Sequence, residues 1–115
     1  MSSRSDLARI QDILDAIQSI QGKTRSLSFE QFCQDEILIK AVLYDLIVIG
    51  EAANNISNDI QALAPEIPWR LMSDMRNIVA HEYFRVNLRI TWSTVQRNLQ
   101  PLITPLQQLK AKLID

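Results

Sequence analysis

The chain has 115 residues, of which 47% are apolar and 22% charged, and its net charge is −1. This length suits one domain, and the composition excludes a disordered polypeptide. Two glycines and four prolines argue against a turn-rich β fold and favour long helices with few loops. We therefore expect a single domain over residues 1–115 that is all-α, an antiparallel bundle of four to five helices.

Cysteine usage and the N-terminal segment point to a compartment. Cys33 is the single cysteine, so no disulfide can form within the chain, which favours a reducing environment. Residues 1–6 lack the apolar stretch of a signal peptide. The most hydrophobic run, residues 37–49, contains Lys40 and Asp45 and is too short to cross a bilayer. These features predict a cytoplasmic protein with no membrane contact.

The first predicted helix runs from about Ser5 to Gln21, because apolar residues recur there at helical spacing. Gly22 follows as an expected C-terminal stop. Ser28 and Gln31 then form a capping-box pattern that opens the next helix.

This second helix meets no glycine or proline before Gly50, so we predict one continuous helix from about Ser28 to Ile56. Between residues 37 and 49 it is apolar on nearly every side, which predicts a central helix covered by its neighbours. A glycine inside a helix costs up to about 1 kcal/mol relative to alanine. Gly50 therefore predicts the close approach of another helix.

The C-terminal half continues the helical pattern. Residues 57–67 are predicted to form a loop with a short helical turn, and Pro68 is placed to open a third helix that reaches about Tyr83. Asn87 is a good cap for a fourth helix, which Pro101 kinks or restarts. The fourth helix and its continuation carry an apolar stripe: Leu88, Trp92, Val95, Leu99, Leu102, Leu106, Leu109 and Leu113.

Polar side chains that could take part in catalysis or binding are concentrated in residues 76–83. His81 is the sole histidine of the chain, and Arg76, Asn77, Glu82 and Tyr83 surround it. Histidine exchanges protons near neutral pH, and arginine offers planar donors suited to a phosphate. Together they favour phosphodiester chemistry. RNA supplies its own 2′-hydroxyl nucleophile, so this reaction requires neither a metal nor another cofactor, and one histidine without a carboxylate cluster makes a poor metal site.

The spacing of these residues leaves their arrangement open. Asn77 and His81, four apart, share a helix face, and all of the polar residues converge if the helix unwinds near His81. A structural interpretation, which is the commoner one for such residues, has His81 capping the last carbonyls and Arg76 pairing with Asp74 or Glu82. Cleavage by acid and base catalysis normally uses two groups, and a two-fold dimer would supply two copies of the segment to one cleft.

Charge is unevenly spread along the chain. Residues 1–68 carry five basic and ten acidic side chains, a balance of −5, whereas residues 69–115 carry seven and three, a balance of +4. This asymmetry indicates an anionic ligand near the C-terminal half, although ordinary solvated faces would also produce it. Candidate RNA-binding residues besides Arg76 are Arg70, Arg85 and Arg89.

The series Arg76-x4-His81-x-Tyr83 resembles the RX4–6HXY motif of the HEPN superfamily. Over nearly its full length the chain resembles the HepT-like toxins of HEPN/MNT toxin–antitoxin pairs. The residues that carry this resemblance are Asp12-Ile13-Leu14, Ala16-Ile17, Phe29-Glu30-Gln31-Phe32, Ile49-Gly50-Glu51-Ala52, Ile67-Pro68-Trp69, Arg76-Asn77, His81-Glu82-Tyr83-Phe84, Trp92 and Leu99-x-Pro101-Leu102.

The resemblance implies a helical homodimer that acts on RNA as a metal-independent endoribonuclease. It places Arg76 and His81 as the catalytic pair, with Asn77 as a supporting polar residue. It also implies that Tyr83 is the tyrosine to which an MNT-type nucleotidyltransferase antitoxin transfers AMP. Two alternatives remain: a non-catalytic HEPN module that supports a nucleotidyltransferase partner, and a simple helical dimerisation domain.

Overall fold

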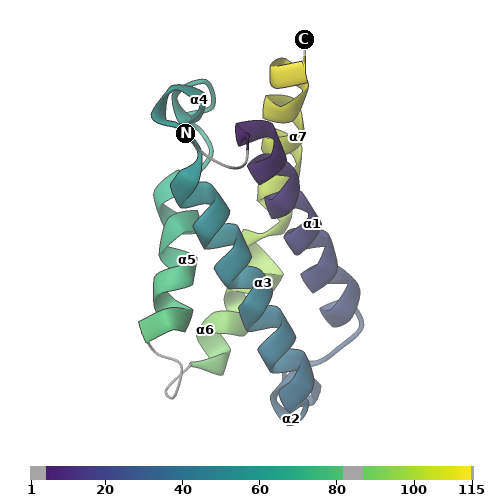
Figure 1. The fold of residues 1–115 in the computed structure, drawn as a ribbon. Coiled ribbons are helices and arrows are strands. Elements are labelled where there is room, and N and C mark those ends of the chain that lie inside the picture. The colour runs from purple at the N-terminus through teal and green to yellow at the C-terminus, as the bar shows by residue number, and fades with distance from the viewer. Residues whose placement is uncertain (1–4, 82–86, 115) are drawn as a thin grey trace.

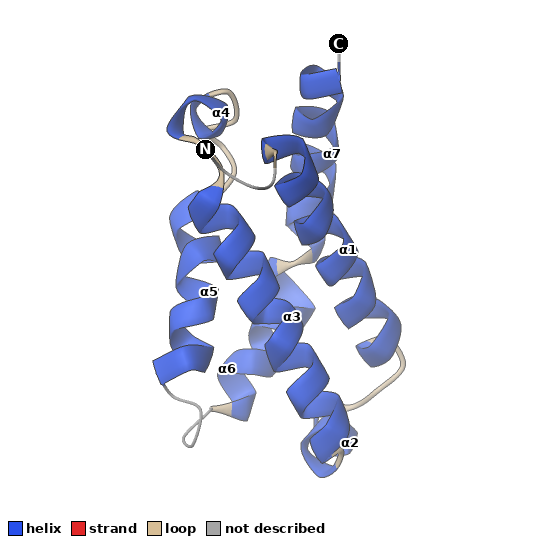
Figure 2. Cartoon of the chain, viewed as in Figure 1, coloured by secondary structure: helices blue, strands red, loops and turns tan. Residues whose placement is uncertain are grey.

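A computed structural model describes residues 5–81 and 87–114. These residues form helices and loops with no strand, which confirms the all-α prediction. Four longer helices run up and down: α1 (Asp6–Thr24), α3 (Glu36–Asn55), α5 (Trp69–His81) and α7 (Gln100–Ile114) (Figure 1). Shorter helices connect them: α2 (Phe29–Gln34), α4 (Asn58–Ala62) and α6 (Leu88–Ser93) (Figure 2). The predicted antiparallel bundle is therefore observed.

The first helix is longer than predicted. It begins after Ser5, whose hydroxyl accepts a hydrogen bond from the Ala8 N–H at 3.0 Å, and it ends at Thr24 instead of Gln21. The predicted stop at Gly22 is wrong, because this glycine stays in right-handed helix and the Arg25 N–H still donates to the Gln21 carbonyl. Its apolar stripe enters the core, as the spacing predicted: Ile10, Ile13, Ile17 and Ile20 are fully buried.

The predicted continuous helix from Ser28 to Ile56 is wrong, because the helix is interrupted at Asp35. The capping box of Ser28 and Gln31 is confirmed and opens α2. Asp35 then leaves helical geometry, with φ −108° and ψ 90°, and its carboxylate accepts from the Leu38 N–H at 3.0 Å. Aspartate favours this capping arrangement over a helix interior, and so it starts α3.

The central helix α3 is covered on part of its surface, not on nearly every side as predicted. It packs against α5 and α1, and its residues on those sides join the core: Val42, Leu43, Leu46, Ile49, Ala52 and Ala53. On the remaining face, however, Ile37 is 82% exposed and Tyr44 is 66% exposed. Large apolar side chains therefore lie on an uncovered face of α3.

The connection between α3 and α5 contains the predicted short turn, α4, in the predicted loop. The Ser57 hydroxyl donates to the Asp6 carboxylate at 2.9 Å, which ties α4 to the start of α1. Helix α5 begins one residue later than predicted. Pro68 precedes it and accepts from the Met72 N–H at 3.0 Å, and the buried Trp69 indole donates to the Ala64 carbonyl at 3.0 Å.

The C-terminal part follows the prediction in outline. The Asn87 side chain accepts from the N–H groups of Arg89 and Ile90 and so caps α6. A π-helical stretch, η2 (Thr94–Asn98), then separates α6 from α7, which starts one residue before Pro101. The predicted restart near Pro101 is confirmed, whereas the π-helical stretch was not predicted. No helix among the described residues is long and apolar enough to span a membrane.

Candidate functional site

Helix α5 carries the first part of the predicted functional segment. The backbone is helical through His81, so the helix does not unwind before that residue. In a regular helix, positions 76 and 81 differ by about 140° around the axis and about 7.5 Å along it. Positions 77 and 81 differ by about 40° and share a face. Residues 82–86 lie outside the described part of the chain. The roles predicted for Tyr83 and Arg85 therefore stay predictions.

Helices α3 and α5 approach each other closely at Gly50. A Cβ atom added to Gly50 would lie 2.7 Å from the Cβ and the backbone nitrogen of Arg76, and 3.1 Å from the Met72 carbonyl oxygen. Real Cβ atoms do not tolerate such contacts with backbone. The predicted close helix approach at Gly50 is thus confirmed, and it fixes the backbone that presents Arg76.

Arg76 is held by an acidic residue that the sequence analysis did not assign to the site. Its Nη1 atom donates to Glu51 Oε2 at 2.6 Å, across the gap between α5 and α3. Of the two partners that the structural alternative predicted, Asp74 is wrong, because its carboxylate lies 4.0 Å from Arg70 and Arg76 contacts Glu51, and Glu82 lies outside the described residues. The position of Glu51 beside Gly50, at the expected helix approach, was the available signal.

The ion pair orients the guanidinium without using all of its donors. Arginine has five N–H donors in a fixed plane, and the contact with Glu51 engages one terminal nitrogen. The Arg76 side chain is 32% exposed and that of Glu51 is 56% exposed, so both remain accessible. Arg76 can therefore bind an anion while Glu51 sets its direction. Asn77, the next residue of α5, is exposed as well.

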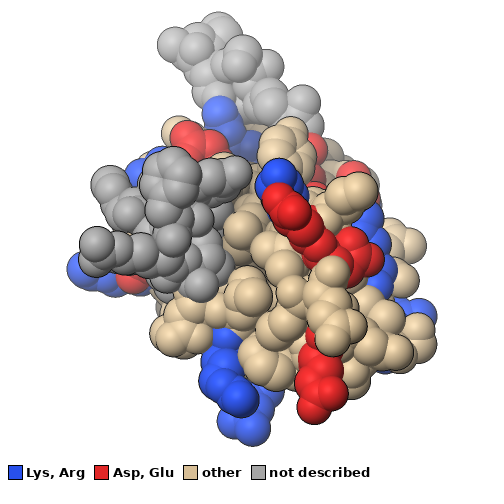
Figure 3. Space-filling model, turned by 90° about the horizontal axis from the view of Figure 1, so that it is seen from below, with Lys and Arg blue, Asp and Glu red and all other residues tan. Residues whose placement is uncertain are grey.

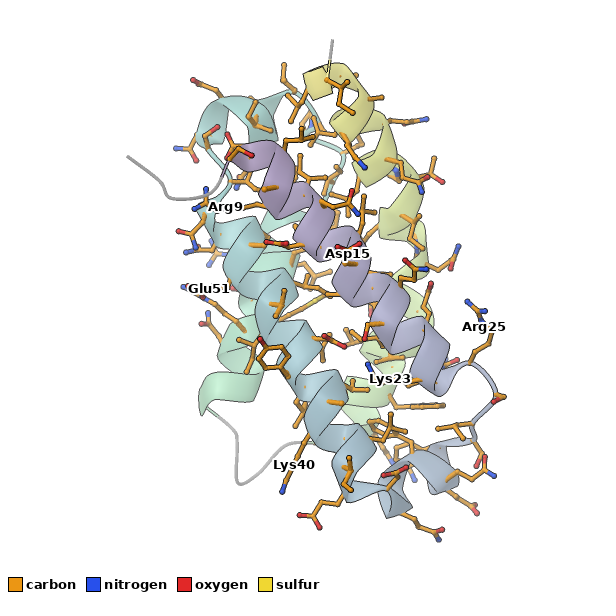
Figure 4. All side chains as sticks on the ribbon, turned by 45° about the vertical axis from the view of Figure 1, so that its right-hand side comes forward. Arg9, Asp15, Lys23, Arg25, Lys40 and Glu51 are labelled. Carbon is orange, nitrogen blue, oxygen red and sulfur yellow. The ribbon has the colours of Figure 1, made fainter. Side chains whose placement is uncertain are left out.

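Glu51 also borders a cleft of about 280 Å³ between α1 and α3. Figure 4 shows Glu51 on α3 and Arg9 on α1 along the same side of the molecule. The cleft is lined by Arg9, Asp12, Val48, Glu51, Ala52 and Asn55. Its charges are mixed, which makes it a poorer anion site than the Arg76 guanidinium itself.

The other described arginines of the prediction lie apart from Arg76. Arg70 is almost fully exposed in the first turn of α5 and pairs with Asp74. Arg89 lies at the start of α6, with its guanidinium carbon 4.8 Å from the centre of the Phe29 ring. Among the described residues, no three His, Cys, Asp or Glu side chains are grouped so that they could hold a metal ion.

Replacing Gly50 by alanine should destabilise the protein by about 1–3 kcal/mol, because the new methyl group overpacks two backbones that cannot move independently. Gly22→Ala is the matched control. It is also a helical glycine, but an added Cβ there meets nothing within 4 Å, so this variant should be stabilised by about 0.5–1 kcal/mol. Urea denaturation followed by circular dichroism measures both. Equal stability of the Gly50→Ala variant and the parent would contradict the close packing.

Comparison with known proteins adds an independent line of evidence. A family described as ribonuclease HepT-like matches residues 13–109. A protein of Thermococcus cleftensis named "Probable ribonuclease HepT" is 41% identical over 107 residues, which cover 93% of this chain and 97% of that protein.

More distant relatives extend the comparison. A protein of Caldanaerobacter subterraneus subsp. tengcongensis is 30% identical over 90% of this chain and 92% of its own length. One from Methanocaldococcus jannaschii is 31% identical over 86% of this chain and 91% of its own length. Both of these proteins are named as RNases, with the assignment marked as provisional. No solved structure gives a significant match.

Proposed function

Because the chain belongs to the HepT-like ribonuclease family, we propose that it is an endoribonuclease that cleaves RNA without a metal ion, with Arg76 and His81 as its catalytic pair. The observation that carries this proposal is the placement of Arg76. A tight helix crossing at Gly50 fixes its backbone, and a 2.6 Å contact with Glu51 directs its guanidinium while leaving further donors accessible.

The proposed reaction uses the nucleophile of the substrate. His81 of one copy takes the proton of the 2′-hydroxyl as the 2′-oxygen attacks the adjacent phosphorus, and His81 of a second copy gives a proton to the 5′-oxygen as the P–O5′ bond breaks. Arg76 stabilises the negative charge that accumulates on the phosphate oxygens. Asn77, on the same face of α5 as His81, orients the phosphate or the imidazole.

We propose that the active form is a homodimer in which two copies of the segment 76–83 face one cleft. Ile37, Tyr44 and Glu51 follow one another at intervals of seven residues, so they share a face of α3. The exposed apolar part of this face therefore continues directly to the Glu51–Arg76 pair. A second copy that covers it would bring its own Arg76 and His81 close to the first.

Sedimentation equilibrium should give twice the chain mass, and Tyr44→Lys should shift the protein to a monomer and lower RNA cleavage at least tenfold. A stable interface buries on the order of 1,200 Å² or more, and a lysine at its centre would be costly. Ile114→Lys is the matched control, because Ile114 is similarly exposed, at 62%, on α7. A parent protein that sediments as a monomer while cleaving RNA would rule out the shared cleft.

In this proposal the protein is the toxin of a toxin–antitoxin pair. Its antitoxin is an MNT-type nucleotidyltransferase that transfers AMP to Tyr83, two residues after His81. An added nucleotide would place negative charge and bulk in a cleft that binds RNA, and so would block cleavage.

The competing function is a non-catalytic helical module that supports a nucleotidyltransferase. Expression in a bacterial host separates the two. The catalytic proposal predicts that the wild-type chain arrests growth, that co-expression of a cognate nucleotidyltransferase restores it, and that His81→Ala is harmless at the same protein level. Equal arrest by the wild-type chain and by His81→Ala would reject His81 as a catalytic residue.

A further inference from the structure

A second feature of interest is a cleft of about 330 Å³ between α2, α6 and η2, separate from the Arg76–Glu51 pair. This volume is within the range of small-ligand sites. Arginine, aromatic and amide side chains surround it: Phe29, Arg89, Trp92, Ser93, Gln96 and Arg97.

Trp92 offers an anchored aromatic surface in this cleft. Its ring lies 5.0 Å from that of Phe32, which is fully buried, and 6.3 Å from that of Phe29. The Trp92 side chain itself remains partly exposed. Aromatic rings held in this way are the surfaces on which proteins stack the bases of single-stranded nucleic acids.

The described lining of the cleft carries positive charge and no carboxylate. None of the ion pairs among the described residues involves Arg89 or Arg97. An adjoining cleft of about 260 Å³ shares Gln96 and adds Arg25, again without a carboxylate in its lining. Figure 3 shows a group of basic side chains at the lower edge of this end of the molecule, with uncharged residues between it and the nearest acidic side chain, and further basic side chains elsewhere on the same face.

Three other clefts of the described surface differ in this respect. Each has at least one carboxylate in its lining: Asp15 in one, Asp12 and Glu51 in another, Asp35 and Glu36 in the third. A carboxylate in the lining weakens the binding of a phosphate. Charge complementarity therefore favours the Trp92 cleft for an anionic ligand.

The backbone of the cleft is itself unusual. Gln96 and Arg97 belong to the π-helical stretch η2. Such stretches are rare, and they occur frequently at functional sites, because the wider turn redirects side chains from a regular helix. This observation is independent of the charge and of the aromatic rings.

We propose that this cleft binds one nucleotide of the single-stranded RNA substrate, away from the scissile bond. The base stacks on Trp92, the flanking phosphates contact Arg89 and Arg97, and the Gln96 amide hydrogen-bonds the base edge. The proposal rests on the proposed ribonuclease function. Arg89 follows His81 by eight residues, a span of at most about 29 Å, so one strand can reach both sites.

The contribution of the two arginines is tested by the binding of a fluorescent single-stranded 2′-O-methyl oligoribonucleotide. This probe lacks the attacking hydroxyl, so it is not cleaved while its binding is measured. Arg89→Ala and Arg97→Ala should each raise the dissociation constant about tenfold, the effect of one charge-assisted hydrogen bond. Each should also lower the slope of the logarithm of the binding constant against the logarithm of the salt concentration, by about the contribution of one phosphate contact. Lys112→Ala, near the far end of α7, removes the same charge and should change neither.

Tryptophan fluorescence tests the stacking. The chain has two tryptophans, and Trp69 is buried, so a Trp69→Phe variant reports on Trp92 alone. The oligonucleotide should quench this variant strongly and should leave a Trp92→Phe variant, which reports on Trp69, nearly unchanged. Inorganic phosphate should produce no quenching.

The outcomes separate the two proposals. A wild-type protein that cleaves RNA, with unchanged affinity in the Arg97→Ala variant and no quenching of Trp92, would overturn the nucleotide cleft and leave the ribonuclease intact. Quenching and arginine-dependent binding in a protein that cleaves no RNA would support the cleft and overturn the ribonuclease. A free mononucleotide that quenches Trp92 at the same concentration as the oligonucleotide would reject an RNA strand as the ligand, because it lacks the second flanking phosphate and the contacts of the rest of the strand.

Discussion

Replacing Arg76 with alanine is expected to slow RNA cleavage by about 10²–10³-fold, the usual cost of removing one preorganised donor to a developing oxyanion. Arg76→Lys should recover only part of this loss, because lysine brings the charge but not the planar pair of donors. Single-turnover cleavage of a labelled RNA measures both variants. Loss of the ion pair itself should cost only about 0–1 kcal/mol of stability, because its Glu51 end is 56% exposed.

A substitution at Glu51 tests whether Arg76 acts through its orientation or through its charge alone. Glu51→Gln should lower kcat about tenfold, because one tenfold step corresponds to about 1.4 kcal/mol of lost transition-state positioning. Its KM for RNA should not rise, because the variant removes a negative charge from the site. Glu36→Gln is the matched control, since Glu36 lies on the same helix and pairs with Lys40 at 3.1 Å, and its kcat should be unchanged.

An Arg76→Ala variant that folds and cleaves RNA at the parental rate would remove this residue from the mechanism. Equal changes of kcat in the Glu51→Gln and Glu36→Gln variants would show that Glu51 acts only through its negative charge and does not orient Arg76. In that case the 2.6 Å contact would be an ordinary surface ion pair.

Changing Tyr83 to phenylalanine should abolish AMP transfer by the nucleotidyltransferase and leave most of the RNA cleavage. A phenol with an unperturbed pKa near 10 is a poor proton carrier at neutral pH, whereas its oxygen is a usable acceptor for a nucleotidyl group. In cells, this variant should remain toxic in the presence of an antitoxin that acts by modification.

Mass spectrometry after incubation with the nucleotidyltransferase and ATP gives the AMP transfer, and an RNA cleavage assay gives the activity. Tyr44→Phe is a control for the other tyrosine of the chain, and it should be modified like the parent. Undiminished AMP transfer to the Tyr83→Phe variant would identify another acceptor. Complete loss of cleavage in a folded Tyr83→Phe variant would assign the hydroxyl to the chemistry.

Sequence periodicity predicted the bundle well because most apolar residues of α1 and α7 obey one helical repeat. Gly50 was equally informative, since a glycine within a strongly apolar helix has few reasons to exist other than close packing. The break at Asp35 was missed because glycine and proline were taken as the breakers, whereas an aspartate followed by Glu36 also starts a helix. Exposure of Ile37 and Tyr44 could not follow from hydrophobicity, which does not tell a core face from an uncovered one.

The candidate site was predicted at the level of residue types and not of contacts. Arg76 was found through its motif, but its partner Glu51 is 25 positions away in sequence, so no local pattern joins them. The Trp92 cleft was missed for a similar reason. Phe29 and Trp92 come from separate helices, and the π-helical stretch that presents Gln96 and Arg97 has no sequence signature as clear as a cap or a proline.

The most direct test is cleavage of a single-stranded RNA by the purified protein in excess EDTA, with the His81→Ala variant assayed beside it. Loss of a general acid–base group typically costs about 10²–10⁴-fold in rate. We predict the same rate of cleavage with and without EDTA, products that end in a 2′,3′-cyclic phosphate, and a loss of that size in a folded His81→Ala variant. Cleavage that stops in EDTA and returns with added Mg²⁺, or that survives in the His81→Ala variant, would contradict metal-independent catalysis by Arg76 and His81.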